Sequence, residues 1–524
     1  MIEQNEPAPQ ESALSYLLLA LILITTTALS LIWSHAKLLW KDEFLSFYSD
    51  GVATFQQVLL VQLHHPISLD PPTYHLLSHL SMDLFGRNAI ALRLPALAGF
   101  LLFQLCLFFF VRRLAGNRAA VIAAALPLLT ASFGYSAEGR PYGLLLGLYA
   151  LSLLCWQISA DDPPNRRRFL ALIGLALSIA LAITSHYFGI LILIPVSLGE
   201  LARILNRKRL DLGILAALIL GLASVSLILP FQKALMVYRQ HYYIAGVNLH
   251  DISQGYRELF LRYTTWPLLL QKVAAALMVI LALALVYAGY QRFKRRPANE
   301  PAATWVALIA MALLPLFGYL FGRFVTHTME VRYVIAALIA FVATLAIVLE
   351  RRLRNSTFYA STLILILVAS LILNIRNIQQ ERRTSNEILA RFQLSPQTTI
   401  AFNQDPHEPI YLQSLSDFYI DSFYAPNPAL RSRFSLIDGQ CEEIRWLAHD
   451  TESVTAENMR TFTPLSITPY AVFRTHPHPF LILHPGSWQW IDKQITAENA
   501  PQTIIGPALG GDLVRITNLA AKGH

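Results

Sequence analysis

An adjacent acidic pair, Asp42-Glu43, follows the first long apolar run of the chain, Ser15 to His35. Carboxylates at the mouth of a membrane helix lie where the dielectric is lowered, and such groups can act as general bases. Acids just past a membrane span are also commonly solvated and without a chemical role. The pair is therefore a candidate base whose role depends on the elements around it.

Other residues of suitable chemistry stand at the ends of later apolar runs. Arg140 and Arg332 each lie at a helix end, where a guanidinium group could hold a phosphate. Tyrosine hydroxyls could bind a sugar and tyrosine rings could stack on one; the candidates are Tyr135, Tyr142 and Tyr333. A glycosyl transfer from a lipid-phosphate donor needs these parts: a base for the acceptor proton, cations for the leaving phosphate and a groove for the lipid.

Each of these residues also has a purely structural interpretation. Arg332 could extend to a lipid phosphate, and Arg140 could pair with Glu138. Aromatic side chains occur at every membrane interface, so single tyrosines are weak signals. His64 and His65 could join Asp42 or Asp70 at a metal, but adjacent histidines point in different directions and no spaced ligand set follows, which favours a surface role.

The composition is that of an integral membrane protein. The 524 residues are 55% hydrophobic and only 14% charged. The net charge of +8 does not indicate nucleic acid, because the basic residues cluster in short loops between apolar runs and no nucleic-acid motif is present. Two of the three cysteines fall inside apolar runs, so the cysteines predict no disulfide framework.

Hydropathy predicts about eleven transmembrane helices, the first retained as an anchor and not cleaved as a signal peptide. The candidate spans are Ser15 to His35, Ala91 to Val111, Ala119 to Ser132, Tyr142 to Ala160, Phe169 to Ser185, Phe188 to Leu205, Gly213 to Pro230, Leu268 to Gln291, Trp305 to Phe321, Tyr333 to Leu349 and Thr357 to Ile375. His186, between two of them, is interpreted as an interfacial residue.

Five clusters of arginine and lysine fall on one side of the membrane if the segment from Gly51 to Arg87 does not cross it. Within that segment Pro72 to Phe85 and Val52 to His64 are predicted to be helices that lie on or project from the outer surface. The acidic pair would then face the non-cytoplasmic side.

The same orientation divides the chain into regions. We predict a cytoplasmic N-terminus over 1–14, a catalytic transmembrane module over 15–205 with its first outer loop at 36–90, and further transmembrane helices over 206–375. Residues 376–524 are predicted to form a small extracytoplasmic α/β or α+β domain, indicated by runs such as Thr398 to Phe402 and Phe480 to Leu483.

Four segments, in order, carry a resemblance to a known superfamily. They are Trp40-Lys41-Asp42-Glu43; Asp70-Pro71-Pro72-Thr73-Tyr74-His75-Leu76-Leu77; Leu84-Phe85-Gly86 with Ala91-Leu92-Arg93-Leu94-Pro95; and Tyr135-Ser136-Ala137-Glu138-Gly139-Arg140-Pro141-Tyr142. Together they resemble the GT-C integral membrane glycosyltransferases, in the branch of protein O-mannosyltransferases and lipid A aminoarabinose transferases. The resemblance spans Ser15 to about Leu205, with a weaker match at Val331-Arg332-Tyr333.

The resemblance implies a GT-C-like fold and an inverting transfer, on the outer face of a bacterial cytoplasmic membrane, from a polyprenyl-phosphate sugar to a lipid, glycan or protein acceptor. It implies that Asp42 is the catalytic acidic residue and that Glu43 is the second acid of the family's pair. Residues that would line the donor site are Glu138, Arg140, Tyr142, Arg332 and Tyr333, with Asp70, Tyr74, Tyr135 and His65 as candidates in the substrate loops.

One position departs from the family pattern. Family members usually have His-Pro-Pro where this chain has Asp70-Pro71-Pro72, and His65-Pro66 is not an obvious substitute. The extra carboxylate beside a phosphate site predicts a different donor contact or a different metal requirement, and the need for a divalent cation stays open.

Two other classes of function remain in view. A transporter or flippase for a polyprenyl-linked or polar substrate would be expected to show internal repeats and polar, interrupted helices near the midplane. Here the strongest polar features lie in the predicted outer loops, which favours surface chemistry. A catalytically silent assembly partner is the third class, against which the intact Asp42-Glu43 pair argues.

Overall fold

The computed structural model describes residues 9–238, 241, 246–260, 302–405, 407–475, 479–485 and 489–516, with a few positions between 272 and 294. The chain divides into two compact units. The first comprises 1–35, 70–229 and 245–378, and the second comprises 36–69, 230–244 and 379–524.

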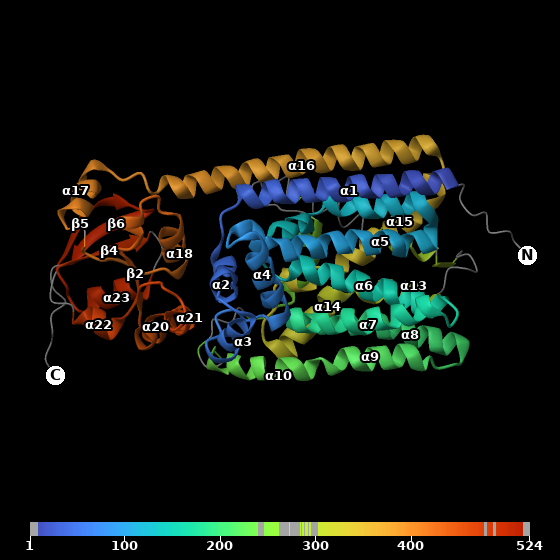
Figure 1. Cartoon of the computed structure of the whole chain (residues 1–524), viewed down its shortest axis with the longest axis horizontal. Helices are drawn as coiled ribbons and strands as arrows, with labels where there is room; N and C mark the ends of the chain where they lie inside the picture. Colours follow the sequence, from blue (N-terminus) through green and yellow to red (C-terminus); the bar gives the residue numbers. More distant parts are fainter. Residues whose placement is uncertain are drawn as a thin grey trace, which may run out of the picture. The chain divides into compact units, whose positions relative to one another are not determined.

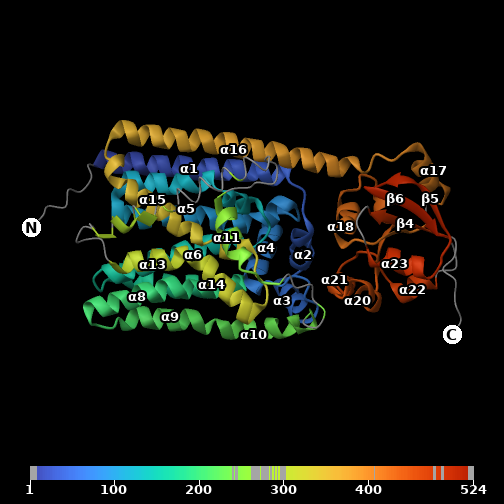
Figure 2. The same cartoon turned by 180° about the vertical axis from the view of Figure 1, so that it is seen from behind.

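The first unit is a bundle of long apolar helices, several of which run roughly parallel in Figures 1 and 2. Its helices are α1 (Pro9–Ala36), α4 (Pro72–Phe85), α5 (Ala89–Ala125), α6 (Tyr142–Asp161), α7 (Arg166–Ser185), α8 (Leu193–Arg207), α9 (Leu212–Ala223), α10 (Val225–Ala234), α11 (His250–Phe260), α13 (Ala302–Ala312), α14 (Leu314–Phe321), α15 (Ala337–Leu353) and the first part of α16 (Ser356–Ala390). Short turns of helix lie between them: η1 (Leu126–Leu129), η2 (Ala131–Ala137), η3 (Tyr187–Ile192), a π turn η5 (Gly322–Thr326) and η6 (Val331–Val334).

The helices confirm a multi-pass membrane protein. Within the described ranges, seven are long and apolar enough to span a bilayer, or eight if the bent pair α13 and α14–η5 counts as one span. The predicted spans Ala91 to Val111 and Ala119 to Ser132 join in α5, which bends at Gly116, where φ is +77°. The predicted span Leu268 to Gln291 lies almost wholly outside the described residues.

Glycines bring α5 and α6 unusually close. A Cβ atom on Gly99 would lie 2.2 Å from the Cα of Leu144, and one on Gly147 would lie 2.3 Å from the carbonyl oxygen of Gly99. Only glycine permits this backbone approach, as in many packed membrane helices. The contact fixes the start of α6, at Tyr142, against α5.

The helix predicted over Pro72 to Phe85 is present with the same bounds as α4. Proline at the start of α4 suits the first helical turn, because its missing N–H would be unpaired there in any case. The Thr73 hydroxyl donates to that of Thr184 at 2.7 Å, and the Tyr74 hydroxyl donates to the Leu92 carbonyl at 3.3 Å. These bonds attach α4 to α7 and α5 and hold the preceding Asp70 in place.

The second unit contains a six-stranded sheet, which confirms the expected small mixed domain. Its strands are β1 (Ile410–Leu412), β2 (Phe434–Asp438), β3 (Ile467–Pro469), β4 (Phe480–Pro485), β5 (Gln502–Ala508) and β6 (Gly511–Ile516). The spatial order is β3-β2-β1-β4-β6-β5, with β3, β2, β1 and β4 parallel and the β5–β6 hairpin antiparallel. Leu509 and Gly510 both have positive φ, as a two-residue hairpin turn requires.

Helices complete the second unit, and some of them pack on the sheet. They are α2 (Lys41–Asp50), α3 (Phe55–His64), η4 (Leu235–Tyr238), α17 (Pro396–Gln404), α18 (Leu415–Tyr424), α19 (Pro428–Arg431), α20 (Gln440–Leu447), α21 (Thr451–Arg460), α22 (Tyr470–Arg474) and α23 (Trp490–Ala497). The alternating run Thr398 to Phe402 forms part of α17 and not a strand. The Ser395 hydroxyl accepts from the Thr398 N–H and Pro396 follows it, so a helix begins there.

Candidate functional site

The acidic pair lies in the first turn of α2, in the second unit. Asp42 is half-buried, whereas Glu43 is fully buried. Glu43 Oε2 accepts a hydrogen bond from the Trp40 N–H at 3.4 Å, so this carboxylate helps to cap α2. The geometry therefore separates the two acids, with Glu43 bound to its own helix end.

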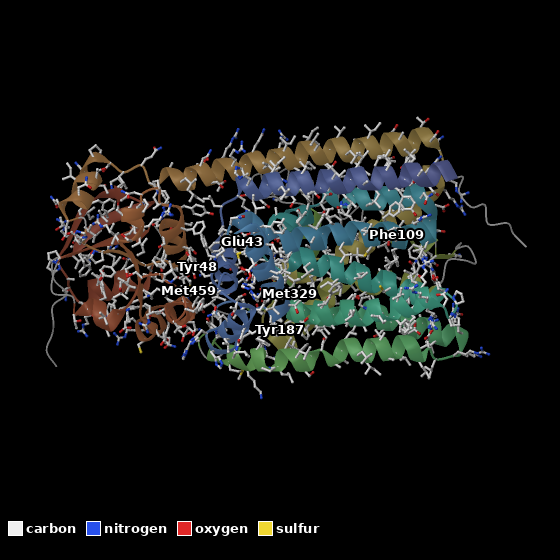
Figure 3. The ribbon with its side chains drawn as sticks, in the orientation of Figure 1. Glu43, Tyr48, Phe109, Tyr187, Met329 and Met459 are labelled. Carbon is white, nitrogen blue, oxygen red and sulfur yellow. The ribbon has the colours of Figure 1, made fainter. Side chains whose placement is uncertain are left out.

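Aromatic packing joins α2 to α18 of the mixed domain. The Phe44 ring centroid lies 5.2 Å from that of Tyr419 and 5.6 Å from that of Phe423, and Phe47 packs edge-on against Phe423. The Leu39 N–H donates to the Tyr424 hydroxyl at 2.9 Å. Figure 3 marks Glu43 and Tyr48 on α2 and Met459 on α21. The helix that carries Asp42 is thus packed into the core of the C-terminal domain.

An ion pair beside Asp42 links α2 to a second helix of that domain. Lys41 Nζ lies 2.5 Å from Glu452 Oε1, and Glu452 Oε2 also accepts from the Leu415 N–H at 3.3 Å. The Glu452 carboxylate therefore contacts the starts of both α2 and α18, where helix dipoles favour an anion.

Several of the other candidate residues lie together in the first unit, around Asp70. Arg140 Nη2 lies 2.5 Å from Asp70 Oδ2, and His186 Nε2 lies 3.7 Å from Asp70 Oδ1. All three residues are buried. Arg140 thus forms an ion pair with Asp70, and its backbone N–H donates to the Glu138 carbonyl at 2.8 Å.

Aromatic rings form one wall of this cluster. Tyr333 lies 4.7 Å from His186 and 6.2 Å from Tyr142, ring centroid to ring centroid, and Tyr135 packs against Tyr142 at 5.4 Å. The Arg332 guanidinium stands 5.5 Å over the Tyr142 ring and 6.0 Å from that of Tyr333. A cation is thereby held beside flat aromatic surfaces, an arrangement suited to a sugar phosphate.

Burial and charge set the protonation of the cluster. Burial alone would raise the pKa of Asp70, but the Arg140 guanidinium, with His186, His75 and Arg332, holds that pKa below its ordinary value. Burial lowers the pKa of His186 to about 4, so the imidazole is neutral near pH 7. Asp70 is consequently an anion that neutralises one guanidinium of the site.

His186 was interpreted from the sequence only as an interfacial residue. It is 4% exposed and packs between Asp70 and Tyr333, so it belongs to the cluster. The only sequence signal was its position between two apolar runs. Tyr74 is fully buried and its hydroxyl donates to the Leu92 carbonyl, and His65 follows α3 in the other unit. Tyr187 and Met329, labelled in Figure 3, belong to the same unit as the cluster.

Across the part of the chain that the structure describes, no three His, Cys, Asp or Glu side chains are grouped closely enough to hold a metal ion. Two guanidinium groups belong to the cluster, that of Arg140, which pairs with Asp70, and that of Arg332, which lies over Tyr142.

Comparisons with known proteins agree with this fold. Residues 69–231 match the family model described as dolichyl-phosphate-mannose-protein mannosyltransferase. The crystal structure of ArnT from Cupriavidus metallidurans bound to undecaprenyl phosphate superposes with a TM-score of 0.61 at 13% identity, covering 96% of this chain and 98% of ArnT. The chain therefore shares the fold of ArnT over almost its whole length.

ArnT in its apo state gives a similar result, with a TM-score of 0.58 at 12% identity, covering 98% of this chain and all of that one. No curated protein matches the sequence. The family match covers Asp70, Glu138, Arg140 and His186.

Proposed function

We propose that the protein is an inverting glycosyltransferase that moves a sugar from a polyprenyl-phosphate donor to a hydroxyl of a lipid, glycan or protein acceptor. The observation that carries the proposal is the buried Arg140–Asp70–His186 cluster, which lies inside the segment 69–231 that matches the dolichyl-phosphate-mannose-protein mannosyltransferase family. Arg332, which lies outside that segment in the chain, stands over two tyrosine rings beside the cluster. ArnT, which has the same fold, was crystallised with undecaprenyl phosphate.

In this proposal the donor phosphate binds at Arg332. A guanidinium group presents several donors to phosphate oxygens, and Arg332 stands beside Tyr142 and Tyr333, on which a sugar ring can stack. Arg140 provides a second cation, whose charge Asp70 partly neutralises. That neutralisation would keep the phosphate from binding too tightly to leave as product, and Glu138 would contact donor hydroxyls.

Asp42 acts as the base. It removes the proton from the acceptor hydroxyl as that oxygen attacks the anomeric carbon, and the bond from this carbon to the phosphate oxygen breaks with its electron pair going to the phosphate. The products are the inverted glycoside and the polyprenyl phosphate. Glu43, whose carboxylate accepts from the Trp40 N–H at the start of α2, would hold in position the helix that carries Asp42.

The reaction is assigned to the outer face of a bacterial cytoplasmic membrane. The five basic loops support a cytoplasmic position for the opposite ends of the helices. The C-terminal domain, packed on α2 through Phe44 and Lys41, would then also be outside and would influence the choice of acceptor.

The test is transfer of radiolabelled sugar from the lipid-phosphate pool in isolated membranes. We expect Asp42→Asn to be inserted and folded but to lose transfer by at least a hundredfold, within the range that a general base contributes. Asp83→Asn is the matched control, since Asp83 lies on an exposed face of α4 and should leave transfer unchanged. Near-normal transfer by Asp42→Asn would refute Asp42 as the base.

A further inference from the structure

A polar cavity of about 190 Å³ lies at the end of α6 that is remote from Tyr142. Since α6 has 20 residues, its two ends stand about 30 Å apart, close to the thickness of the bilayer core. The cavity is therefore at the other membrane surface from the Asp70–Arg140 cluster. Its polar walls come from the ends of α6 and α8 and the beginning of α13: Gln157, Asp161, Arg203, Asn206, Arg207 and Thr304.

Most charges around the cavity are already paired. Arg203 Nη2 lies 2.7 Å from Glu200 Oε1 and 2.7 Å from Asp211 Oδ2. Asp161 lies 3.6 Å from Arg113. These pairs give the cavity a rigid polar rim.

Arg207 differs from its neighbours. Its Nη1 donates to the Ala160 carbonyl at 3.3 Å, and no carboxylate among the described residues is within ion-pair distance of it. A guanidinium has five N–H donors, so most of those on Arg207 stay available to an anion in the cavity. The amide of Asn206 and the hydroxyl of Thr304 supply further donors to the same space.

Gln157 offers the cavity a hydrogen-bond acceptor. It is 1% exposed, and its Nε2 donates to the Phe110 carbonyl at 3.4 Å, but its Oε1 has no hydrogen-bond partner. A buried acceptor of this kind is costly unless something donates to it. Asp161 adds a carboxylate acceptor to the same wall. The cavity thus presents donors for an anion at one side and acceptors for a donor group at the other.

Exposed apolar side chains lie on the other face of α8 from the cavity. Leu205 and Leu201, four residues apart, are 69% and 49% exposed, and each lies about 200° around the helix from Arg203. In a membrane-spanning bundle such a face contacts acyl chains. A lipid whose headgroup enters the cavity from the membrane surface would keep its apolar part in the bilayer beside the bundle.

We propose that this cavity binds the headgroup of an ethanolamine phospholipid. The phosphodiester binds Arg207, Asn206 and Thr304, and the ammonium group donates to Gln157 Oε1 and Asp161. An ammonium has three N–H donors, whereas the quaternary ammonium of a choline headgroup has none, so the site selects between them. A lipid bound here is structural or regulatory and is not the sugar donor.

The test is native mass spectrometry of the full chain released from micelles that contain equal amounts of phosphatidylethanolamine and phosphatidylcholine. We expect bound ethanolamine lipid to exceed choline lipid at least tenfold in the wild type. Arg207→Gln and Gln157→Met should each reduce that ratio at least tenfold, while Arg207→Lys should keep part of it. Arg209→Gln, an exposed neighbour outside the cavity, is the matched control and should bind like the wild type.

Equal retention of the two lipids by the wild type, or an unchanged ratio in Arg207→Gln, would overturn the proposal. Soluble phosphorylethanolamine separates a lipid from a free phosphoester: binding as tight as that of the whole lipid would overturn the lipid assignment. Asp42→Asn should retain the same lipid ratio, so a failure of the proposed transferase activity and a failure of this site can be told apart.

Discussion

The buried pair of Asp70 and Arg140 gives the most demanding test of the site. The two side chains are 6% and 8% exposed and 2.5 Å apart. Removing one partner leaves the other charge buried without compensation, which typically costs about 3–5 kcal/mol. We expect Asp70→Asn to lower the free energy of unfolding by about 3 kcal/mol or more, because Arg140 and Arg332 then repel one another with less compensation.

The double variant separates charge from packing. If the pair is the cause, Asp70→Asn with Arg140→Gln should cost less than the sum of the two single changes by about 1–3 kcal/mol. Equilibrium unfolding in mixed detergent micelles measures the three values. Glu350→Gln removes one half of the more exposed pair with Arg354 and should change stability by less than about 1 kcal/mol.

The same variant tests the ligand. A bound phosphate would replace the missing Asp70 carboxylate as the counter-charge of Arg140. Undecaprenyl phosphate should therefore stabilise Asp70→Asn by about 2.7 kcal/mol at a hundredfold excess over its Kd for the variant, and should stabilise the wild type less at the same concentration. Strict additivity of the two substitutions, together with equal stabilisation by the lipid, would refute this reading of the cluster.

Further predictions concern pH and the packing of α2. Burial lowers the pKa of His186 from 6.5 to about 4, so between these pH values the unfolded chain binds more protons than the folded protein. The free energy of unfolding should therefore fall by up to about 3 kcal/mol as the pH drops through this range. His186→Gln should make the free energy of unfolding depend less on pH. Phe44→Ala, which empties a fully buried ring, should destabilise the second unit by about 3–5 kcal/mol in a proteolysis assay. Lys41→Glu should lower kcat for transfer more than it changes KM for the donor. Adding Glu452→Lys to the same chain should restore part of kcat, because the ion pair then forms with its charges exchanged. No recovery of kcat in the double variant would refute a positioning role for the Lys41–Glu452 ion pair.

Much of the local structure was predictable because it depends on near neighbours in the chain. Long apolar runs predicted membrane helices, and the proline at 72 with the following apolar pattern predicted α4 with the bounds it has. Residue order in four motifs was enough for the resemblance to a GT-C protein, and Arg140, Tyr142, Arg332 and Tyr333 were all named from their positions at helix ends. The 3.6-residue period of a helix and the order of motifs can be read from the chain without knowing which elements pack together.

The long-range contacts were not predictable in this way. Glu138 was the expected partner of Arg140 because it is two residues away, yet the fold brings Asp70, 70 residues earlier, into the ion pair. His186 and Thr398 show the same limit, since burial of the first and helix formation at the second depend on neighbours that the local pattern does not specify.

The sequence by itself determined a multi-pass membrane protein, its apolar helices and the chemical types at its candidate site, because these follow from composition and local periodicity. Tertiary structure alone decided that Asp70 neutralises Arg140, that Glu43 caps its own helix, and that α2 packs on the C-terminal domain through Phe44 and Lys41. The physical reason is that ion pairing and burial depend on distances between side chains far apart in the chain, and only the packed fold sets those distances.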